Sequence, residues 1–195
     1  MIPSLTTILT VLLSYGLGCF NTAYYVVRWR TGQDIRTLGS GAAGARNAGR
    51  VLGRHGFIVV FAGDLLKGAL ALYLARWMAL PPWGVAASMV AVVLGHLYPV
   101  QLNFRGGKGA ATSFGAVVVI NPLLALLFLG VAGVIFAVSR NFTISGIVAF
   151  VTAPALAYLL GIFGALWVAI TVIALLLLYA HRTNLRSLYR QFSRG

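Results

Sequence analysis

The sequence predicts an all-α integral membrane protein with seven transmembrane helices. Of its 195 residues, 60% are hydrophobic and only 9% are charged, and no soluble domain of this size needs so much apolar sequence. The apolar residues fall mostly into runs of roughly 20, the length that an α-helix needs to cross the hydrocarbon core of a bilayer. We therefore expect a single polytopic membrane domain over residues 1–195.

Each expected helix is bounded by polar residues, proline or glycine. The runs lie at about 4–27, 57–80, 83–102, 108–120, 122–139, 144–160 and 164–180. No basic segment precedes the first run, so we interpret it as a span and not as a cleaved signal sequence. Pro81-Pro82 turns the chain after the second run, and Gly161 lies in the break before the last one.

The apolar stretch from Ala110 to Val138 is the ambiguous element. A single helix there would give six spans and leave both termini on the same side of the membrane. Asn121-Pro122 favours two helices instead, because the residue before a proline avoids the helical region. The first of these, about 108–120, then reaches only about 18–20 Å and must tilt or lie recessed in the bundle.

The charge distribution sets the expected orientation. The sequence has fifteen Lys and Arg residues and only two carboxylate side chains, which gives a net charge of +13. Cytoplasmic loops are rich in Lys and Arg, so the arginine-rich segment after the first run is expected inside and the N-terminus outside. Seven spans then place Arg140 and the basic C-terminal tail in the cytoplasm as well, and leave only Arg76 among the arginines outside.

The same composition excludes several function classes. The basic residues are scattered between apolar runs and not gathered on a soluble module, which argues against nucleic-acid binding. Two carboxylates, Asp34 and Asp64, are too few for a two-metal site or a paired-carboxylate hydrolase, and the single Cys19 forms no disulfide framework. We expect no metal and no cofactor. The positive charge is explained by topology and by attraction to anionic membrane lipid.

The first polar segment, residues 39–54, is the centre of the predicted site. It begins with the spacing G-x-G-x-x-G and continues with four polar side chains, Arg46, Asn47, Arg50 and Arg54. A dinucleotide-binding fingerprint would need a strand and a parallel sheet around it, and none is predicted here. We expect instead a compact loop whose N–H groups and arginine side chains bind phosphate. Ser40 adds a hydroxyl, for which turn capping is the alternative role.

Two further polar segments share this character. NFRGGKGAAT at residues 103–112 lacks the full P-loop pattern, but a lysine at a helix N-terminus suits phosphate binding. The alternative is that Arg105 and Lys108 are ordinary charges flanking a span. At the end of the last run, His181 and Asn184 are candidates for a phosphate ligand or a proton acceptor.

Polar residues inside the spans are expected to have structural partners. Asp64 and Lys67 lie three residues apart on one helical face, and both a structural ion pair and a direct ligand role stay open. His96 is expected to bond a backbone carbonyl at the end of its helix. Small residues that recur within spans are expected to allow close helix packing, namely Gly16, Gly18, Gly130 and Gly133.

Together these segments resemble the PlsY family of bacterial membrane acyltransferases, which pass an acyl group from acyl phosphate to glycerol 3-phosphate. The likeness spans nearly the whole chain, and its most specific stretch is GHLYPVQLNFRGGKGAAT at residues 95–112. It implies seven helices in the bacterial inner (plasma) membrane, with the active site facing the cytoplasm. It also implies catalytic roles for Arg50, Lys108 and His181, and substrate binding by Ser40, Gly41, Asn47, Arg50, Gly106, Gly107, Lys108, His181 and Asn184.

The sequence departs from the family pattern at several positions. The first motif of the family reads GSGNxGATN, whereas Ala42 and Arg46 stand here in place of its Asn and Thr. Thr143 and Ser145 take the place of a serine-rich motif, and Thr183 replaces an acidic residue. The glycine-glutamate tail of the family is absent. These departures bear on substrate affinity and activity more than on the fold.

The expected function is therefore acyl transfer to glycerol 3-phosphate, giving lysophosphatidate and phosphate in phospholipid biosynthesis. An acyl phosphate has a good leaving group, so a covalent enzyme intermediate is unnecessary. Arg50 and Lys108 would neutralise charge, and either His181 or a substrate phosphate oxygen would accept the hydroxyl proton. Two alternatives are a membrane transporter of phosphorylated anions, which would need a route to the outer side, and an inactive lipid-binding paralogue. The sequence does not indicate the oligomeric state of the protein.

Overall fold

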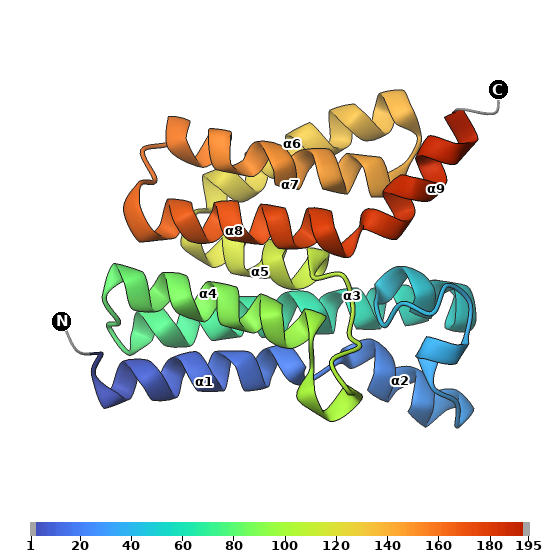
Figure 1. Ribbon diagram of the computed structural model, residues 1–195, viewed down its shortest axis with the longest axis horizontal. Helices are drawn as coiled ribbons and strands as arrows, with labels where there is room; N and C mark the ends of the chain where they lie inside the picture. The colour runs from blue at the N-terminus through green and yellow to red at the C-terminus, as the bar shows by residue number, and fades with distance from the viewer. Residues whose placement is uncertain (1–2, 193–195) are drawn as a thin grey trace. The chain divides into compact units, whose positions relative to one another are not determined.

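The computed structural model describes residues 3–192, which form helices and contain no strand. The chain divides into two compact units, Met1–Ile120 and Asn121–Gly195 (Figure 1). Five described segments are long and apolar enough to cross a membrane: Leu5–Thr31, Ala45–Trp77, Pro82–Leu102, Pro122–Ser139 and Phe142–Leu159. Two shorter apolar helices are Ala110–Ile120 and Gly164–Ala180. The prediction of an all-helical fold is confirmed.

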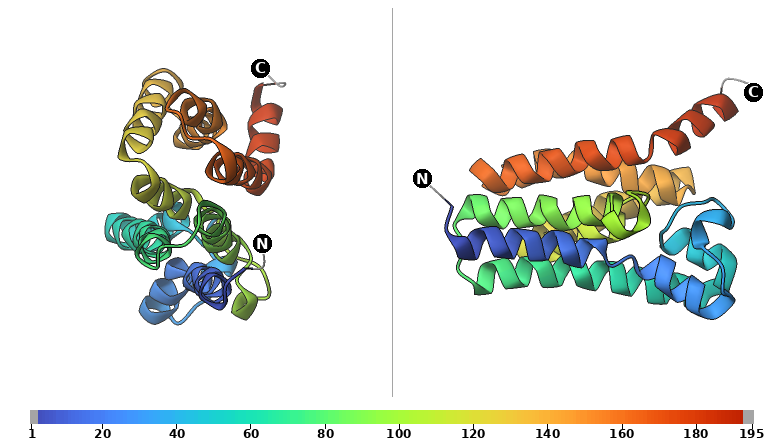
Figure 2. Two further views of the ribbon diagram at one scale, coloured as in Figure 1. Left: turned by 90° about the vertical axis from the view of Figure 1, so that its left-hand side faces the viewer. Right: turned by 60° about the horizontal axis from the view of Figure 1, so that its bottom comes forward.

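The first unit consists of four apolar helices and a polar extension. Its elements are α1 (Leu5–Cys19), α2 (Thr22–Thr31), η1 (Ile35–Thr37), α3 (Ala45–Trp77), α4 (Pro82–Leu97), η2 (Val100–Leu102) and α5 (Ala110–Ile120). Helix α1 packs on α4, and α3 packs on α5 and on α4. Helices α1 and α4 run in one direction and α3 and α5 in the other, so the α2–α3 and α4–α5 connections emerge at the same end of the unit (Figures 1 and 2).

Large apolar side chains cover the outer surface of this unit. On α1, Leu5, Leu9 and Leu12 are 70%, 55% and 61% exposed. On α3, Leu66 is exposed as well. So much exposed leucine suits contact with lipid and not with water.

The expected first span, 4–27, is broken in the structure. Helix α1 ends at Cys19, and α2 starts at Thr22 after Asn21, whose side chain accepts a hydrogen bond from the backbone N–H of Tyr24. Asparagine is among the best helix N-caps, because its side-chain oxygen satisfies an amide that the helix leaves without a partner. The expectation of one continuous helix was therefore wrong at this position.

Helix α3 begins much earlier than residue 57, the expected start of the second span. It covers Ala45–Trp77 and is kinked at Gly53, whose φ of 71° is readily adopted only by glycine. Its 33 residues would extend about 50 Å, well beyond a hydrocarbon core of about 30 Å. The first turns of α3, which carry Arg46 and Arg50, can thus stand outside the apolar layer.

Backbones of the first unit approach each other closely at glycines. A Cβ on Gly18 would overlap the Val92 carbonyl of α4, and a Cβ on Gly68 would overlap the Thr112 carbonyl of α5. Of the glycines expected to allow such packing, only Gly18 does so. Gly16, Gly130 and Gly133 have space around them, so that prediction was wrong for these three.

The second unit contains α6 (Pro122–Ser139), α7 (Phe142–Leu159), α8 (Gly164–Ala180) and α9 (Arg182–Phe192). Helix α7 packs on both α6 and α8. Asn121 caps α6 and Asn141 caps α7 through their side-chain oxygens. The predicted interruption of the long apolar run at Asn121-Pro122 is confirmed, whereas the helical form of the basic tail in α9 was not expected.

Candidate functional site

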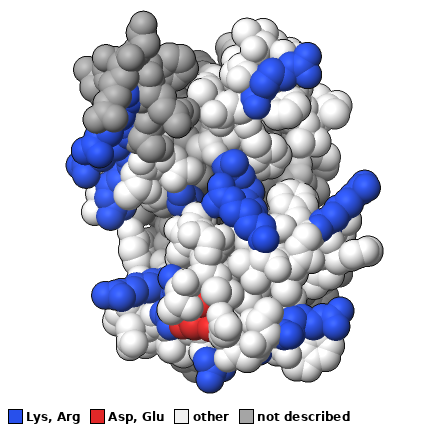
Figure 3. All heavy atoms as spheres, turned by 90° about the vertical axis from the view of Figure 1, so that its right-hand side faces the viewer, with Lys and Arg blue, Asp and Glu red and all other residues white. Residues whose placement is uncertain are grey.

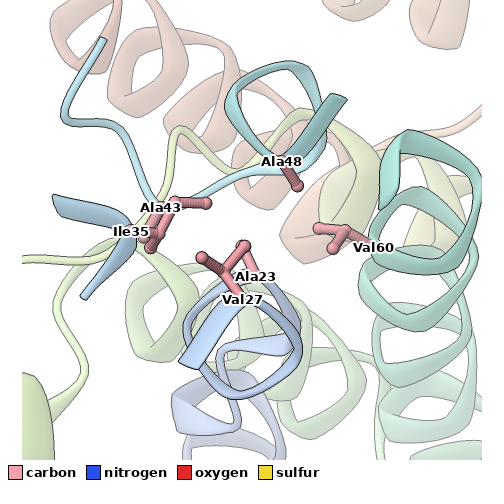
Figure 4. Packing of buried hydrophobic residues seen from close by; sticks show 6 residues of the cluster. All are labelled: Ala23, Val27, Ile35, Ala43, Ala48 and Val60. Carbon is pink, nitrogen blue, oxygen red and sulfur yellow. The ribbon is translucent and has the colours of Figure 1, made fainter. Parts of the chain in front are cut away.

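The first polar segment is held in place by a small apolar core. Figure 4 shows the side chains of this core, which come from α2, from the α2–α3 connection and from α3. All of them are fully buried: Ala23, Val27, Ile35, Ala43, Ala48 and Val60. This core fixes the glycine-rich loop against two helices, and so it fixes the direction in which the loop presents its polar groups.

The Asn47 side chain holds the loop in its conformation through hydrogen bonds to the loop backbone. The side chain is buried and donates to the carbonyls of Ile35 (3.2 Å) and Leu38 (2.9 Å), while its oxygen accepts from the backbone N–H of Ser40 at 2.8 Å. A Cβ on Gly39 would overlap that oxygen. These bonds engage the Asn47 amide with the loop, and the substrate contact of Asn47 stays a prediction. Ser40 and Gly41 are exposed on this loop, as is Gly39.

The second polar segment packs against the end of α4. The N–H of Gly106 donates to the carbonyl of Leu97 at 3.0 Å, and that of Gly107 to the carbonyl of His96 at 3.1 Å. Both glycines lie where a Cβ would overlap neighbouring atoms. Glycine is needed at both positions because the backbone passes too close to its neighbours for a Cβ. The N–H groups of the two glycines already donate to backbone carbonyls. Lys108 follows, just before the first turn of α5.

The two polar loops of the first unit touch each other. Arg36 Nη1 donates to the carbonyl of Leu102 at 2.7 Å, and a Cβ on Gly107 would overlap the carbonyl oxygen of Ala43. Segments that are separated by about 65 residues in sequence therefore meet at one end of the unit. The predicted convergence of the first two polar segments is observed.

Three cations lie near the contact between these loops. Arg46 and Arg50 lie one turn apart at the start of α3, and Lys108 is half-buried. Burial, followed by the positive charges of Arg46 and Arg50, lowers the pKa of Lys108 below its usual range. Arg46 was counted in the sequence among the arginines of the phosphate-binding loop but was given no catalytic or substrate-binding role, although its position one turn before Arg50 is visible there.

Both acidic side chains of the chain already have cationic partners. Asp34 is paired with Arg36 at 2.6 Å, and its hydrogen bond to that guanidinium lowers the pKa of the Asp34 carboxyl. Asp64 is buried beside Lys67. The sequence contains no other carboxylate side chain. The face drawn in Figure 3 accordingly shows abundant basic and little acidic surface, which favours an anionic ligand.

His181 and Asn184 belong to the second unit. His181 ends α8, and its Nδ1 lies 2.8 Å from the carbonyl oxygen of Leu177. An N–H must donate to that carbonyl, so the neutral ring carries its lone pair on Nε2. Asn184 lies half-buried in the first turn of α9. The predicted site residues thus lie in different units: Ser40, Gly41, Asn47, Arg50, Gly106, Gly107 and Lys108 belong to the first, and His181 and Asn184 belong to the second.

A buried polar cluster lies within the apolar part of the first unit. Lys67 Nζ is 3.0 Å from Asp64 Oδ1 and 2.8 Å from His96 Nδ1. Thr22 donates its hydroxyl to Asp64 Oδ1 at 3.1 Å. His96 was expected to bond a backbone carbonyl, and its ring contacts Lys67 instead. The interpretation of Asp64 and Lys67 as a structural ion pair fits their deep burial.

Fold and site together define a helical, multi-pass membrane protein with a cationic loop cluster at one end of its first unit. The chain belongs to the glycerol-3-phosphate acyltransferase family, whose model matches residues 8–191. A glycerol-3-phosphate acyltransferase 1 of Desulfitobacterium hafniense is 41% identical over 184 residues, covering 94% of this chain and 91% of the relative. A glycerol-3-phosphate acyltransferase of Pseudomonas paraeruginosa is 40% identical over 182 residues, covering 93% and 95%.

Two solved structures share this fold. The crystal structure of PlsY (YgiH), an integral membrane glycerol 3-phosphate acyltransferase, in its glycerol 3-phosphate form is 32% identical, with a TM-score of 0.90. The match covers 95% of this chain and 92% of that one. The lysophosphatidic acid form of PlsY gives a TM-score of 0.86 at 30% identity, with the same coverage. The resemblance predicted from the polar motifs is confirmed.

Proposed function

We propose that this protein transfers an acyl group from acyl phosphate to glycerol 3-phosphate, producing lysophosphatidate and inorganic phosphate for phospholipid biosynthesis. The observation that carries the proposal is the joining of two polar loops into a cluster of Arg46, Arg50 and Lys108. Such a cluster suits phosphorylated substrates. It occurs in a chain whose relatives are named glycerol-3-phosphate acyltransferases and whose structural neighbour was solved in glycerol 3-phosphate and lysophosphatidic acid forms.

The proposed setting is the bacterial inner membrane, crossed seven times, with the N-terminus outside and the cluster facing the cytoplasm. Two observations within the first unit support it. The arginines of α2 and both polar loops lie at the end where these loops emerge, whereas Arg76 lies near the turn between α3 and α4. Basic residues are retained on the cytoplasmic side of membranes. Because the family match covers residues 8–191, we treat the chain as one functional domain.

The first task of the proposed site is to hold two anions together. Arg50 offers a planar fork for two phosphate oxygens, and Lys108 offers a compact charge at the start of α5. The half-buried position of Lys108 strengthens its interaction with an anion, because fewer water molecules compete there. Ser40, on the exposed loop that Asn47 supports, is assigned to orient the glycerol moiety.

The proposed reaction is a direct displacement. A hydroxyl oxygen of glycerol 3-phosphate attacks the carbonyl carbon of the acyl phosphate, and a new ester bond forms. The bond from that carbon to the bridging oxygen breaks, and phosphate leaves with the electron pair. The hydroxyl proton passes to an oxygen of a substrate phosphate group. Cations near the phosphates stabilise the charge of the transition state, and this stabilisation is the main catalytic contribution of the site.

His181 is the alternative proton acceptor, and Asn184 stays a predicted substrate ligand. The hydrogen bond from His181 Nδ1 to Leu177 would leave Nε2 able to accept a proton. A His181→Gln variant separates the two routes. If a substrate phosphate takes the proton, kcat falls less than about tenfold; loss of a general base costs about 100-fold or more.

The proposal is tested with purified protein in detergent micelles, supplied with palmitoyl phosphate and labelled glycerol 3-phosphate. We expect lysophosphatidate to form with wild-type protein and not with Lys108→Ala, whose folding is checked by circular dichroism. A folded wild-type protein that makes no lysophosphatidate refutes the assignment. If the same protein moves glycerol 3-phosphate into liposomes, it is a transporter of phosphorylated anions. If it only binds lipid, it is an inactive paralogue.

A further inference from the structure

The break between α1 and α2 is a hydrogen-bonding centre within the first unit. A helix that ends leaves its last carbonyls without partners inside the helix. Here three successive carbonyls accept from distant side chains: Gly18 from Lys67 at 3.2 Å, Cys19 from Gln101 at 2.5 Å, and Phe20 from Lys67 at 2.8 Å. The break is therefore tied to both α3 and the α4–α5 connection.

The same break also reaches the glycine-rich loop. Asn21 caps α2 with its side-chain oxygen and donates its Nδ2 to the carbonyl of Ala43 at 3.2 Å. Asn21 is fully buried. Both loops of the proposed site are thus anchored on one short segment, residues 18–22, although neither loop lies near it in sequence.

Lys67 connects this segment to His96. Its ammonium nitrogen lies within 3.2 Å of four acceptor atoms: two carbonyl oxygens of the break, Asp64 Oδ1 and His96 Nδ1. An ammonium group can only donate, so His96 Nδ1 accepts, and the neutral ring carries its hydrogen on Nε2. Lys67 therefore fixes both the orientation and the tautomer of His96.

His96 in turn contacts the segment that carries Lys108. Its carbonyl accepts from the N–H of Gly107 at 3.1 Å, and its ring edge at Nε2 lies where a Cβ on Gly107 would be. His96 is only 2% exposed. It is held between Lys67 on one side and the backbone next to Lys108 on the other.

The energetic character of this cluster favours a positioning role. Charged groups inside an apolar span are costly, and a buried ion pair often adds little net stability compared with apolar side chains of similar size. What a fully bonded cluster does provide is a single arrangement of the elements it joins. A displacement of about 1 Å at a substrate-binding charge is enough to lower turnover strongly.

We propose that His96 is a positioning residue for Lys108, and that the buried Asp64–Lys67 pair holds it in place from the α1–α2 break. The inference concerns the site described under the proposed function, and it rests on that function for its kinetic test. Its second test does not depend on activity.

The first test is kinetic and uses His96→Asn. The asparagine Oδ1 can replace His96 Nδ1 as the acceptor for Lys67, but the side chain lacks the ring edge that faces Gly107. We expect the KM for glycerol 3-phosphate to rise about tenfold or more, because a phosphate-binding charge is misplaced. Met89→Ala is the matched control, since Met89 is fully buried on the same helix about two turns earlier. The control is expected to lower stability and leave KM within about twofold of wild type.

The second test follows the amine of Lys108 directly. The sequence has two lysines, and Lys67 is buried, so an amine-directed reagent read out by mass spectrometry reports on Lys108. Burial and the neighbouring arginines lower the pKa of Lys108, so its labelling should begin at lower pH than that of an ordinary lysine. In His96→Asn, a displaced Lys108 should be labelled with a midpoint at higher pH. Met89→Ala should keep the wild-type midpoint.

Each result bears on the inference. An unchanged KM and an unchanged labelling midpoint in a folded His96→Asn protein would overturn it. Equal changes in Met89→Ala would overturn it too, because they would reflect general loosening of α4. If wild-type protein has no acyltransferase activity, the proposed function fails, and the labelling midpoints alone decide whether His96 positions Lys108.

Discussion

Replacing Lys67 by methionine is the sharpest test of how the first unit is held together. Methionine has nearly the length of lysine but no charge and no donor. The change would leave the Asp64 carboxylate without its ammonium partner at 3.0 Å, and the carbonyls of Gly18 and Phe20 without a donor. Asp64 would keep the hydroxyl of Thr22 at 3.1 Å.

The expected cost follows from the burial of these groups. Lys67 and Asp64 are 6% and 2% exposed, so water cannot readily replace the lost partner. Breaking a buried ion pair on one side costs about 3–5 kcal/mol of unfolding free energy. For a chain of this size, that corresponds to a fall of roughly 10 °C in the thermal midpoint. Removing both charges in Asp64→Asn/Lys67→Met should cost less than the single change, because no lone charge stays buried.

The assay is equilibrium unfolding by sodium dodecyl sulfate in mixed micelles, followed by circular dichroism. Lys108→Met is the matched control: the same substitution at the other lysine, which is half-buried at a loop, should change the unfolding free energy by less than about 1 kcal/mol. The reasoning is refuted if Lys67→Met stays within about 1 kcal/mol of wild type, or if the double variant is less stable than Lys67→Met.

Three further predictions concern packing, an ion pair and the site. Gly68→Ala should destabilise the protein by about 1–3 kcal/mol, because its Cβ would meet backbone of α5; Gly130→Ala, in open space, is the control, and equal thermal midpoints would contradict the packing. Asp34→Asn should lower the thermal midpoint near neutral pH, since Arg36 lowers the pKa of Asp34. The stabilising contribution of the Asp34 carboxylate is fully present above its unfolded-state pKa and is lost as the pH falls through its folded-state pKa. The thermal midpoints of wild type and Asp34→Asn should therefore converge in acid. Finally, the KM for glycerol 3-phosphate should rise as Lys108 loses its proton, at a pH below the ordinary lysine range. Lys108→Arg should shift that rise to higher pH, and an identical profile would remove Lys108 from binding.

Most of the helical pattern could be predicted from the sequence, because in a membrane the chain must satisfy its backbone locally. The bounds 122–139 and 164–180 agree with α6 and α8. Asn121-Pro122 marked the end of α5, since proline restricts the residue before it. The break at Asn21 was missed because Asn21 lies within a mostly apolar run, and a long apolar run outweighs one capping residue.

The site was predictable in its residue types and less so in their roles. Glycines and basic residues between apolar runs indicated phosphate chemistry, and the loops carrying Arg50 and Lys108 do meet. Asn47, however, bonds Ile35 and Leu38 within its own loop. The type of a residue shows which bonds it can make, whereas its burial decides with which partners it makes them.

The sequence by itself determined that this chain is a helical membrane protein with cationic loops, because hydropathy, proline, asparagine caps and charge act on neighbouring residues. Only the tertiary structure decided that Lys67 reaches Phe20, 47 residues away, and that His96 lies between Lys67 and Gly107. These contacts depend on which faces of α1, α3, α4 and α5 pack together. That choice is made by close backbone approach at glycines such as Gly18 and Gly68, which local patterns do not distinguish from glycines in open space.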